Sequence, residues 1–171
     1  RIWLCTKNAQ YIYHIQQETI TPLESPIHEE ITSIAQGENN QFFIGTNHKI
    51  YTTRLEDNRL IVKQEPKLDN LPIIQHIYYH PKTQSLLIGT MTDGFYHCDT
   101  IRDSLHNIGN MKDVTINQVV PAHQSENEIL IATDGNGVYK MDMSNHKLTP
   151  YLFEDHRTPN QMNGGIIKDI Y

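Results

Sequence analysis

The chain has 171 residues, a net charge of −6, 37% hydrophobic residues and 20% charged residues, which is typical of a soluble globular protein. Its Lys and Arg residues are scattered, which argues against nucleic acid as a partner because phosphate binding needs clustered basic side chains. No apolar run approaches the roughly 20 residues of a membrane-spanning helix, so we expect no membrane contact by this segment.

The mean hydropathy of −0.54 indicates a core spread thinly over many small elements. The chain opens on the strand-like run Ile2-Trp3-Leu4 without a starting Met, and we therefore expect a piece of a longer protein. Cys5 and Cys98 lack the CxxC spacing of a metal or redox site and do not make a disulfide framework. Both are expected to be ordinary buried strand residues.

A short motif of apolar residues, a small residue and Thr recurs along the chain. It is found at Ile2–Thr6, Phe42–Thr46, Leu86–Thr90 and Leu130–Thr133. The four Thr residues are 40, 44 and 43 residues apart. A fixed period of this size predicts an internally repeated architecture.

Two further elements keep the same phase. An apolar-x-x-apolar signature precedes the Thr motif at Ile31/Ile34, Ile74/Ile77, Ile116/Val119 and Ile167/Ile170. An apolar-Tyr pair follows it at Ile12-Tyr13, Ile50-Tyr51, Phe95-Tyr96 and Val138-Tyr139. Turn-prone polar stretches separate these runs, and a more polar run such as 59–63 or 147–151 closes each unit. Each repeat is therefore predicted to be a four-stranded antiparallel meander.

Meanders with a period of about 43 residues favour an all-β fold made of β-propeller blades. Complete blades are expected at about 27–68, 71–110 and 114–153, with a partial blade at 1–24 and a first strand at 165–171. Small residues should let neighbouring sheets approach, at Cys5, Gly45, Gly89 and Ala132. Large apolar residues should fill the space between blades, at Trp3, Ile44, Ile88 and Ile131.

The ring that these blades would form is incomplete, and two interpretations stay open. In the favoured one, the segment belongs to a larger propeller. In the other, residues 165–171 complete the N-terminal blade and close a four-bladed ring, which would hide the sheet edges.

The sequence pattern of Leu87–Tyr96 and Leu130–Tyr139 resembles the two-component regulator propeller repeat, and that of 163–170 resembles the start of a further unit. The resemblance implies a periplasmic sensor region of a Bacteroidetes-type hybrid two-component histidine kinase, many members of which respond to glycans. It further implies an oligosaccharide ligand, contacts with other blades or domains of the same receptor, and a homodimer.

Propeller geometry gathers the turns between second and third strands at one mouth of the ring. Candidate ligand-binding residues at that mouth are Asn8, His48, Asp93, Asp134 and Asn136, with His28, Glu29 and Glu30 from a linking loop. Polar groups around an aromatic-lined mouth suit hydrogen bonding to a sugar. For Asp134-Gly135-Asn136-Gly137 a tight turn is the simpler interpretation, because Gly and Asn adopt positive φ.

No catalytic residue, metal ligand or cofactor is predicted. The ten His residues form no HxH or HExxH motif, and no GxSxG occurs. We therefore expect this segment not to be an enzyme. The leading functional hypothesis is a ligand-sensing propeller segment of a periplasmic receptor. The alternative is a generic propeller scaffold for protein–protein contact, which would show an exposed apolar patch.

Overall fold

The computed structural model describes residues 1–7, 9–64, 71–102, 104–109, 111–123, 125–152 and 166–171. Its strands are β1 (Ile2–Cys5), β2 (Gln10–His14), β3 (Thr19–Pro22), β4 (Ile31–Gln36), β5 (Gln41–Thr46), β6 (Ile50–Glu56), β7 (Arg59–Gln64), β8 (Ile74–His80), β9 (Ser85–Thr90), β10 (Phe95–Asp99), β11 (Ser104–Ile108), β12 (Ile116–Pro121), β13 (Glu128–Thr133), β14 (Val138–Asp142) and β15 (Lys147–Leu152). No helix in the described part of the chain is long and apolar enough to span a membrane.

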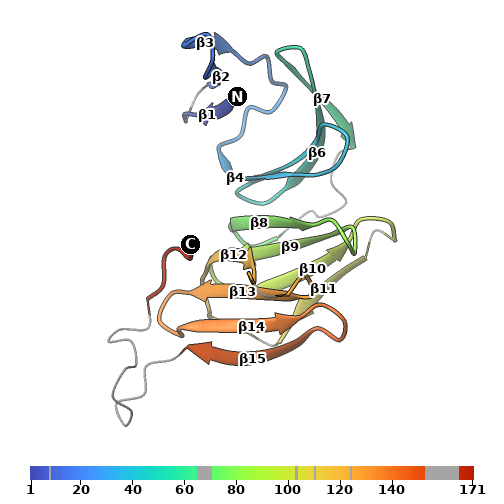
Figure 1. Cartoon of the computed structure of the whole chain (residues 1–171), viewed down its shortest axis with the longest axis vertical. Helices are drawn as coiled ribbons and strands as arrows, with labels where there is room; N and C mark the ends of the chain where they lie inside the picture. Colours follow the sequence, from blue (N-terminus) through green and yellow to red (C-terminus); the bar gives the residue numbers. More distant parts are fainter. Residues whose placement is uncertain (8, 65–70, 103, 110, 124, 153–165) are drawn as a thin grey trace.

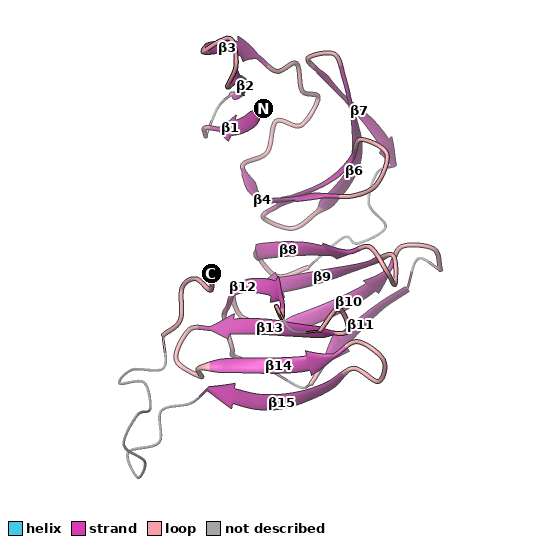
Figure 2. Ribbon diagram, in the orientation of Figure 1, coloured by secondary structure: helices cyan, strands magenta, loops and turns pink. Residues whose placement is uncertain are grey.

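The strands make consecutive antiparallel sheets, which we call the first (β1–β3), second (β4–β7), third (β8–β11) and fourth (β12–β15) sheet. In each, strands follow one another in chain order, as short turns require. Figure 1 shows successive sheets next to one another along the chain, and Figure 2 shows strands and loops throughout. The all-β fold of four-stranded propeller blades is confirmed.

The repeated Thr residues hold equivalent places at the ends of matching strands. Thr46, Thr90 and Thr133 end β5, β9 and β13 and are at most 1% exposed. The Thr90 hydroxyl donates to the carbonyl of Gly94 at 2.9 Å, and the Thr133 hydroxyl donates to that of Gly137 at 2.7 Å. The repeated Thr therefore closes the turn between the second and third strands of each sheet.

The core lies between the sheets and not within any one of them. Clusters of buried apolar side chains fill the first–second, second–third and third–fourth junctions. The small residues act as predicted where a further sheet follows. A Cβ at Gly45 would lie 2.7 Å from Ile77 Cδ1, and one at Gly89 would lie 2.5 Å from Ile116 Cγ2. The first strand of each following sheet thus packs directly on the small residue.

One detail differs from expectation. Cys5 is exposed and not buried, because β1 lies at the edge of its sheet and pairs with β2 alone in the described part of the chain. Trp3 packs into the junction between the first and second sheets, as expected, although it does not hold the place of Ile44. Counting back from the repeated Thr, Leu4 matches Ile44, and Trp3 packs edge-on against Phe42 of the second sheet at 5.3 Å between ring centroids. Cys98 is buried, as expected.

The C-terminal residues lie against the fourth sheet and not beside β1. The backbone N–H of Ile167 donates to Thr133 O at 2.9 Å, and the side chain of Asn117 donates to Ile167 O at 2.9 Å. Figure 1 accordingly shows the C-terminus near β12 and the N-terminus near the first sheet. Membership in a larger propeller stays a prediction.

Candidate functional site

The predicted mouth residues occupy equivalent turns. His48 lies in the β5–β6 turn, Asp93 in the β9–β10 turn, and Asp134 and Asn136 in the β13–β14 turn. Asn8 lies outside the described residues. Gly135 and Gly137 have φ values of 93° and 72°, in keeping with a tight turn. No hydrogen bond joins any two of these four described residues, so each has its own local surroundings.

Those surroundings hold His48 and Asp93 in place. The Nδ1 atom of His48 lies 2.9 Å from Leu71 O, which ties the β5–β6 turn to the segment before β8. The Asp93 carboxylate accepts a short hydrogen bond from the Tyr96 hydroxyl. The backbone carbonyl of Asp93 accepts a second hydrogen bond from the side-chain amide of Asn107. Burial, with the Asp93 hydrogen bond second, raises the pKa of Tyr96. The exposed Asp134 and Asn136 are held through their backbone N–H groups.

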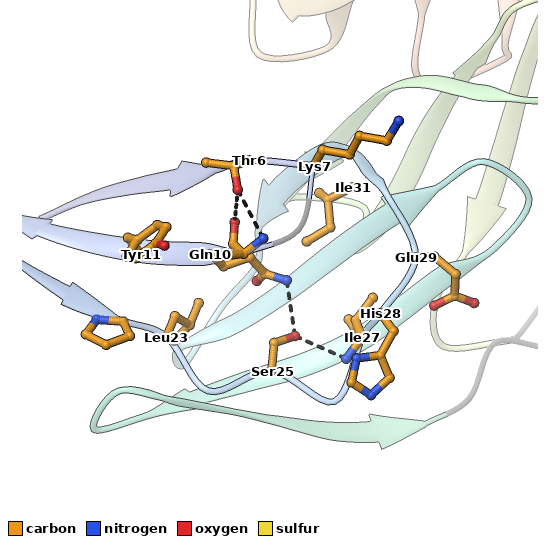
Figure 3. Close-up of a pocket in the computed structure, with 12 residues that line it drawn as sticks. Thr6, Lys7, Gln10, Tyr11, Leu23, Ser25, Ile27, His28, Glu29 and Ile31 are labelled. Carbon is orange, nitrogen blue, oxygen red and sulfur yellow. Dashed lines mark hydrogen bonds between the residues drawn. The ribbon is translucent and has the colours of Figure 1, made fainter.

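A cavity of about 340 Å³ lies where the first and second sheets meet (Figure 3). The β1–β2 turn and the segment joining β3 to β4 supply most of its wall. It is lined by Thr6, Lys7, Ala9, Gln10, Tyr11, Pro22, Leu23, Ser25, Ile27, His28, Glu29 and Ile31. The cavity therefore belongs to the predicted mouth, at the first of its blade junctions.

Gln10 is the most informative residue of this cavity. Alternation along β2 places Gln10 on the same face as Ile12, and only 9% of Gln10 is exposed. Its Nε2 atom donates to Ser25 Oγ at 3.2 Å, and Ser25 Oγ accepts the N–H of Ile27 at 3.1 Å. The Oε1 atom of Gln10 is buried without a hydrogen-bond partner among the described residues. A buried acceptor of this kind costs roughly 1–3 kcal/mol, a cost that a ligand donor would remove.

The rim of the cavity carries charge. The Glu29 carboxylate accepts hydrogen bonds from the Tyr51 hydroxyl at 2.8 and 3.0 Å and lies 3.4 Å from Lys49 Nζ. The Tyr51 hydrogen bond is the largest cause of the lowered pKa of Glu29. Lys7 and His28 are exposed on the same rim. In Figure 3, His28 and Glu29 lie at one end of the cavity and Tyr11 at the other.

The cavity contains some predicted residues and several that were missed. His28 and Glu29 were candidates and line it. Gln10, Ser25 and Thr6 were not singled out. The available signal was a polar residue, Gln10, on the inward-facing side of an otherwise apolar strand. Sequence periodicity indicates burial there but does not indicate that the first and second sheets leave a cavity beside it.

The chemistry of this cavity is that of hydrogen bonding. It offers the amide oxygen of Gln10, aliphatic and phenolic hydroxyl groups, an imidazole, a carboxylate and an ammonium group. In the described ranges, no group of three or more His, Cys, Asp or Glu residues could hold a metal ion. The arrangement suits a polar ligand with several hydroxyl groups.

Comparisons with known proteins show which folds this chain resembles. The model of the Pep3/Vps18/deep orange beta-propeller domain family matches residues 12–163. No curated protein sequence matches the chain significantly. Among solved structures, the extracellular domain of the hybrid two component system BT4673 from B. thetaiotaomicron is similar with a TM-score of 0.75 and 19% identity, over 99% of this chain and 23% of that one.

Two further structures are similar. The extracellular domain of the hybrid two component system BT3049 from B. thetaiotaomicron gives a TM-score of 0.57 at 15% identity, over 75% of this chain and 19% of that one. Kuenenia stuttgartiensis hydrazine synthase gives 0.65 at 11% identity, over 84% and 42%. At these low identities, the TM-scores establish a shared fold alone. The two B. thetaiotaomicron neighbours are of the receptor class that the repeat motifs resemble, and this chain spans less than a quarter of their length.

Proposed function

Because this chain belongs to the Pep3/Vps18/deep orange beta-propeller domain family, we propose that it is a binding segment, and that it senses a ligand in the extracytoplasmic part of a hybrid two-component signalling protein. Two features support the receptor assignment. The repeat motifs resemble those of two-component regulator propellers, and extracellular domains of hybrid two component systems share the fold. The periplasm is the compartment that this proposal implies.

The observation that carries a binding function is the unpartnered Oε1 atom of Gln10 in the cavity between the first and second sheets. A ligand hydroxyl that donates to this oxygen would complete the Gln10–Ser25–Ile27 hydrogen-bond chain. The Tyr11 ring, also in the wall, offers a face for a sugar ring. The proposed ligand is therefore an oligosaccharide, bound without covalent chemistry.

In this proposal, the ligand contacts both sheets at once, since Ile31 of β4 joins Gln10 and Tyr11 of β2 in the cavity wall. A ligand that contacts both sheets favours the packing in which its contacts are complete. A shift in sheet packing is then the signal that passes to the rest of the receptor, including a histidine kinase.

The test is calorimetric titration of the protein with a panel of neutral and acidic oligosaccharides. Gln10→Ala should weaken binding of the recognised sugar about 10-fold or more, because a bound hydroxyl would lose its acceptor. Gln17→Ala, at an exposed glutamine on the β2–β3 turn, is the matched control. Equal affinities for Gln10→Ala and the unchanged protein would exclude this cavity as the binding site.

The same titration tests the other candidates at the mouth. His48→Ala and Asp134→Ala should reduce affinity if the ligand extends across successive turns. If only Gln10→Ala reduces affinity, the ligand is confined to the first junction.

A second function, a scaffold for protein–protein contact, is favoured by one observation. Ile2, Leu4 and Ile20 lie on one face of the first sheet and are 47%, 38% and 59% exposed. An exposed apolar sheet face is typical of an interaction surface. Loss of partner binding in Ile20→Lys, with sugar binding unchanged, would separate this function from ligand sensing.

A further inference from the structure

The β9–β10 turn and the β13–β14 turn have the same construction. In the first, the hydroxyl of the repeated Thr accepts the N–H of Asp93 at 3.0 Å, and in the second it accepts the N–H of Asn136 at 3.1 Å. A glycine of positive φ follows in both, Gly94 with 70° and Gly137 with 72°. Asp93 and Asn136 therefore hold equivalent places in turns of the same shape.

The side chains at these two places differ in reactivity. An amide carbon is open to attack by the backbone nitrogen of the next residue, and asparagine is one of the thermolabile residue types. Glycine as the next residue favours the attack, because without a Cβ its backbone can approach closely. The described part of the chain has this pair at Asn136-Gly137, and a second pair, Asn163-Gly164, lies outside the described residues.

In the β13–β14 turn, both reacting groups are free of hydrogen bonds to described residues. Asn136 is exposed, and only its backbone N–H is held. No described residue accepts the N–H of Gly137. A Cβ at the neighbouring Gly135 would meet nothing within 4 Å, so there is open space beside the turn through which water can reach it.

In the β9–β10 turn, the same two positions are engaged. The N–H of Gly94 donates to Val114 O at 3.2 Å, and the Asp93 carboxylate accepts the Tyr96 hydroxyl. A Cβ at Gly94 would lie 2.5 Å from Met111 O, so the segment before β12 covers this turn. An asparagine at this place would therefore be protected by its surroundings.

We propose that Asn136 is a modification site at which the chain reacts with itself. The backbone nitrogen of Gly137 gives up its proton and bonds to Cγ of Asn136. The side-chain nitrogen takes up a proton and leaves as ammonia. The succinimide ring that results then takes up one water molecule. Cleavage of the new N–Cγ bond gives aspartate, and cleavage of the original peptide bond gives isoaspartate. The inference does not depend on the proposed ligand.

The reaction would change the charge and the length of the turn. Aspartate at this place gives the fourth sheet the carboxylate that the third sheet has at Asp93, two residues from Asp134. Added negative charge disfavours an anionic ligand at the predicted mouth. Isoaspartate adds a methylene group to the main chain, within a turn that Thr133 closes through hydrogen bonds to Gly137 O at 2.7 and 3.1 Å.

The test is peptide mass mapping of the folded protein after incubation at mildly alkaline pH, which favours loss of the Gly137 proton. In the tryptic peptide 113–140, Asn136 should gain the mass difference between an amide and an acid. Part of the product should be methylated by an isoaspartate methyltransferase. Asn117 and Asn127 lie in the same peptide, precede larger residues and should keep their amides.

Asp93→Asn is the matched variant, because it places the same Asn-Gly pair in the covered turn. In the folded protein, Asn136 should lose its amide faster than the residue introduced at position 93. In urea, the two positions should react alike, since the contacts that distinguish the turns are gone. Asn136→Gln should abolish the change at this position, because the longer side chain closes its ring far more slowly.

Two results would overturn the proposal. One is a folded protein in which Asn136 keeps its amide for as long as Asn117 and Asn127 keep theirs. The other is an equal rate at positions 93 and 136 in the folded variant, which would assign the reaction to the residue pair and not to the turn. The pair Asn163-Gly164 falls in a separate peptide, 158–168, and does not affect either comparison.

Discussion

The imidazole rings of His97 and His146 pack against each other across the junction between the third and fourth sheets, with centroids 4.2 Å apart and planes 43° apart. His97 is 7% exposed, and its Nδ1 atom has no hydrogen-bond partner among the described residues. Burial, followed by the neighbouring His146, lowers the pKa of His97 to about 4. His106 and His80 act in the same direction, and Asp99 opposes them. The junction therefore holds His97 neutral.

This pairing predicts a pH-dependent stability. The pKa of His97 is about 4 in the folded chain, against an ordinary value of 6.5. The unfolded chain therefore binds more protons between these values, and stability is lost as pH falls from 6.5 toward 4. The loss from this residue should reach at most about 3 kcal/mol. Urea unfolding at pH 7.5 and 4.5 measures it.

Two variants test whether His97 causes this pH dependence of stability. His97→Phe keeps an aromatic ring at the junction and should remove most of the dependence. His123→Gln, at an exposed position outside the junction, should leave it intact. An unchanged dependence in His97→Phe would mean that other groups are responsible for the acid sensitivity.

The close approach of sheets at Gly89 predicts a large effect of one methyl group. A Cβ there would lie 2.5 Å from Ile116 Cγ2 and 2.7 Å from Ile116 Cβ, which belongs to a branched side chain near the backbone. Gly89→Ala should therefore lower the free energy of unfolding by about 2–3 kcal/mol through overpacking. Gly135→Ala, with nothing within 4 Å but a φ of 93°, should cost only about 1 kcal/mol. Denaturant unfolding compares the two, and similar losses would contradict the packing explanation.

The turn-closing hydroxyl of Thr90 predicts a second contrast. Thr90 is 0% exposed, donates to Gly94 O at 2.9 Å and accepts the N–H of Asp93 at 3.0 Å. Thr90→Val should cost about 1–3 kcal/mol, because the part-buried N–H of Asp93 loses its acceptor, whereas Gly94 O keeps the backbone N–H of Thr90. Thr6 makes the same pair of hydrogen bonds with Ala9 at 2.9 and 3.0 Å, but in solvent. Thr6→Val should cost under about 1 kcal/mol, since water replaces the hydroxyl.

Leu4 and Ile88 hold equivalent places and predict different behaviour. Ile88→Ala should cost about 2–5 kcal/mol in unfolding free energy at any protein concentration, because Ile88 is 0% exposed within one chain. Leu4→Ala should have little effect in dilute solution, where Leu4 is 38% exposed. Denaturant unfolding measures both, and equal losses in the two variants would contradict the difference in burial.

The repeat itself was readable because its signals are local. The apolar run and Thr of Leu86–Thr90, the turn residues 91–94 and the start of the strand that follows lie close together in the sequence, and chain-ordered hairpins need no distant information. The buried strand positions and the small-residue contacts at Gly45 and Gly89 followed from the same period. The exposure of Cys5 did not follow, since it depends on whether another strand covers the edge of β1.

What the sequence by itself determined is the blade: which runs are strands, where the turns fall and which faces are apolar. Tertiary structure alone decided how blades meet. The partnership of His97 with His146 and the cavity beside Gln10 depend on how blades pack. So do the side chains of Ser33, His76 and Gln118, each of which accepts a backbone N–H from the next unit of the chain. These three side chains share no chemistry, because a shift in strand register positions them, and a backbone irregularity of that kind does not require one residue type.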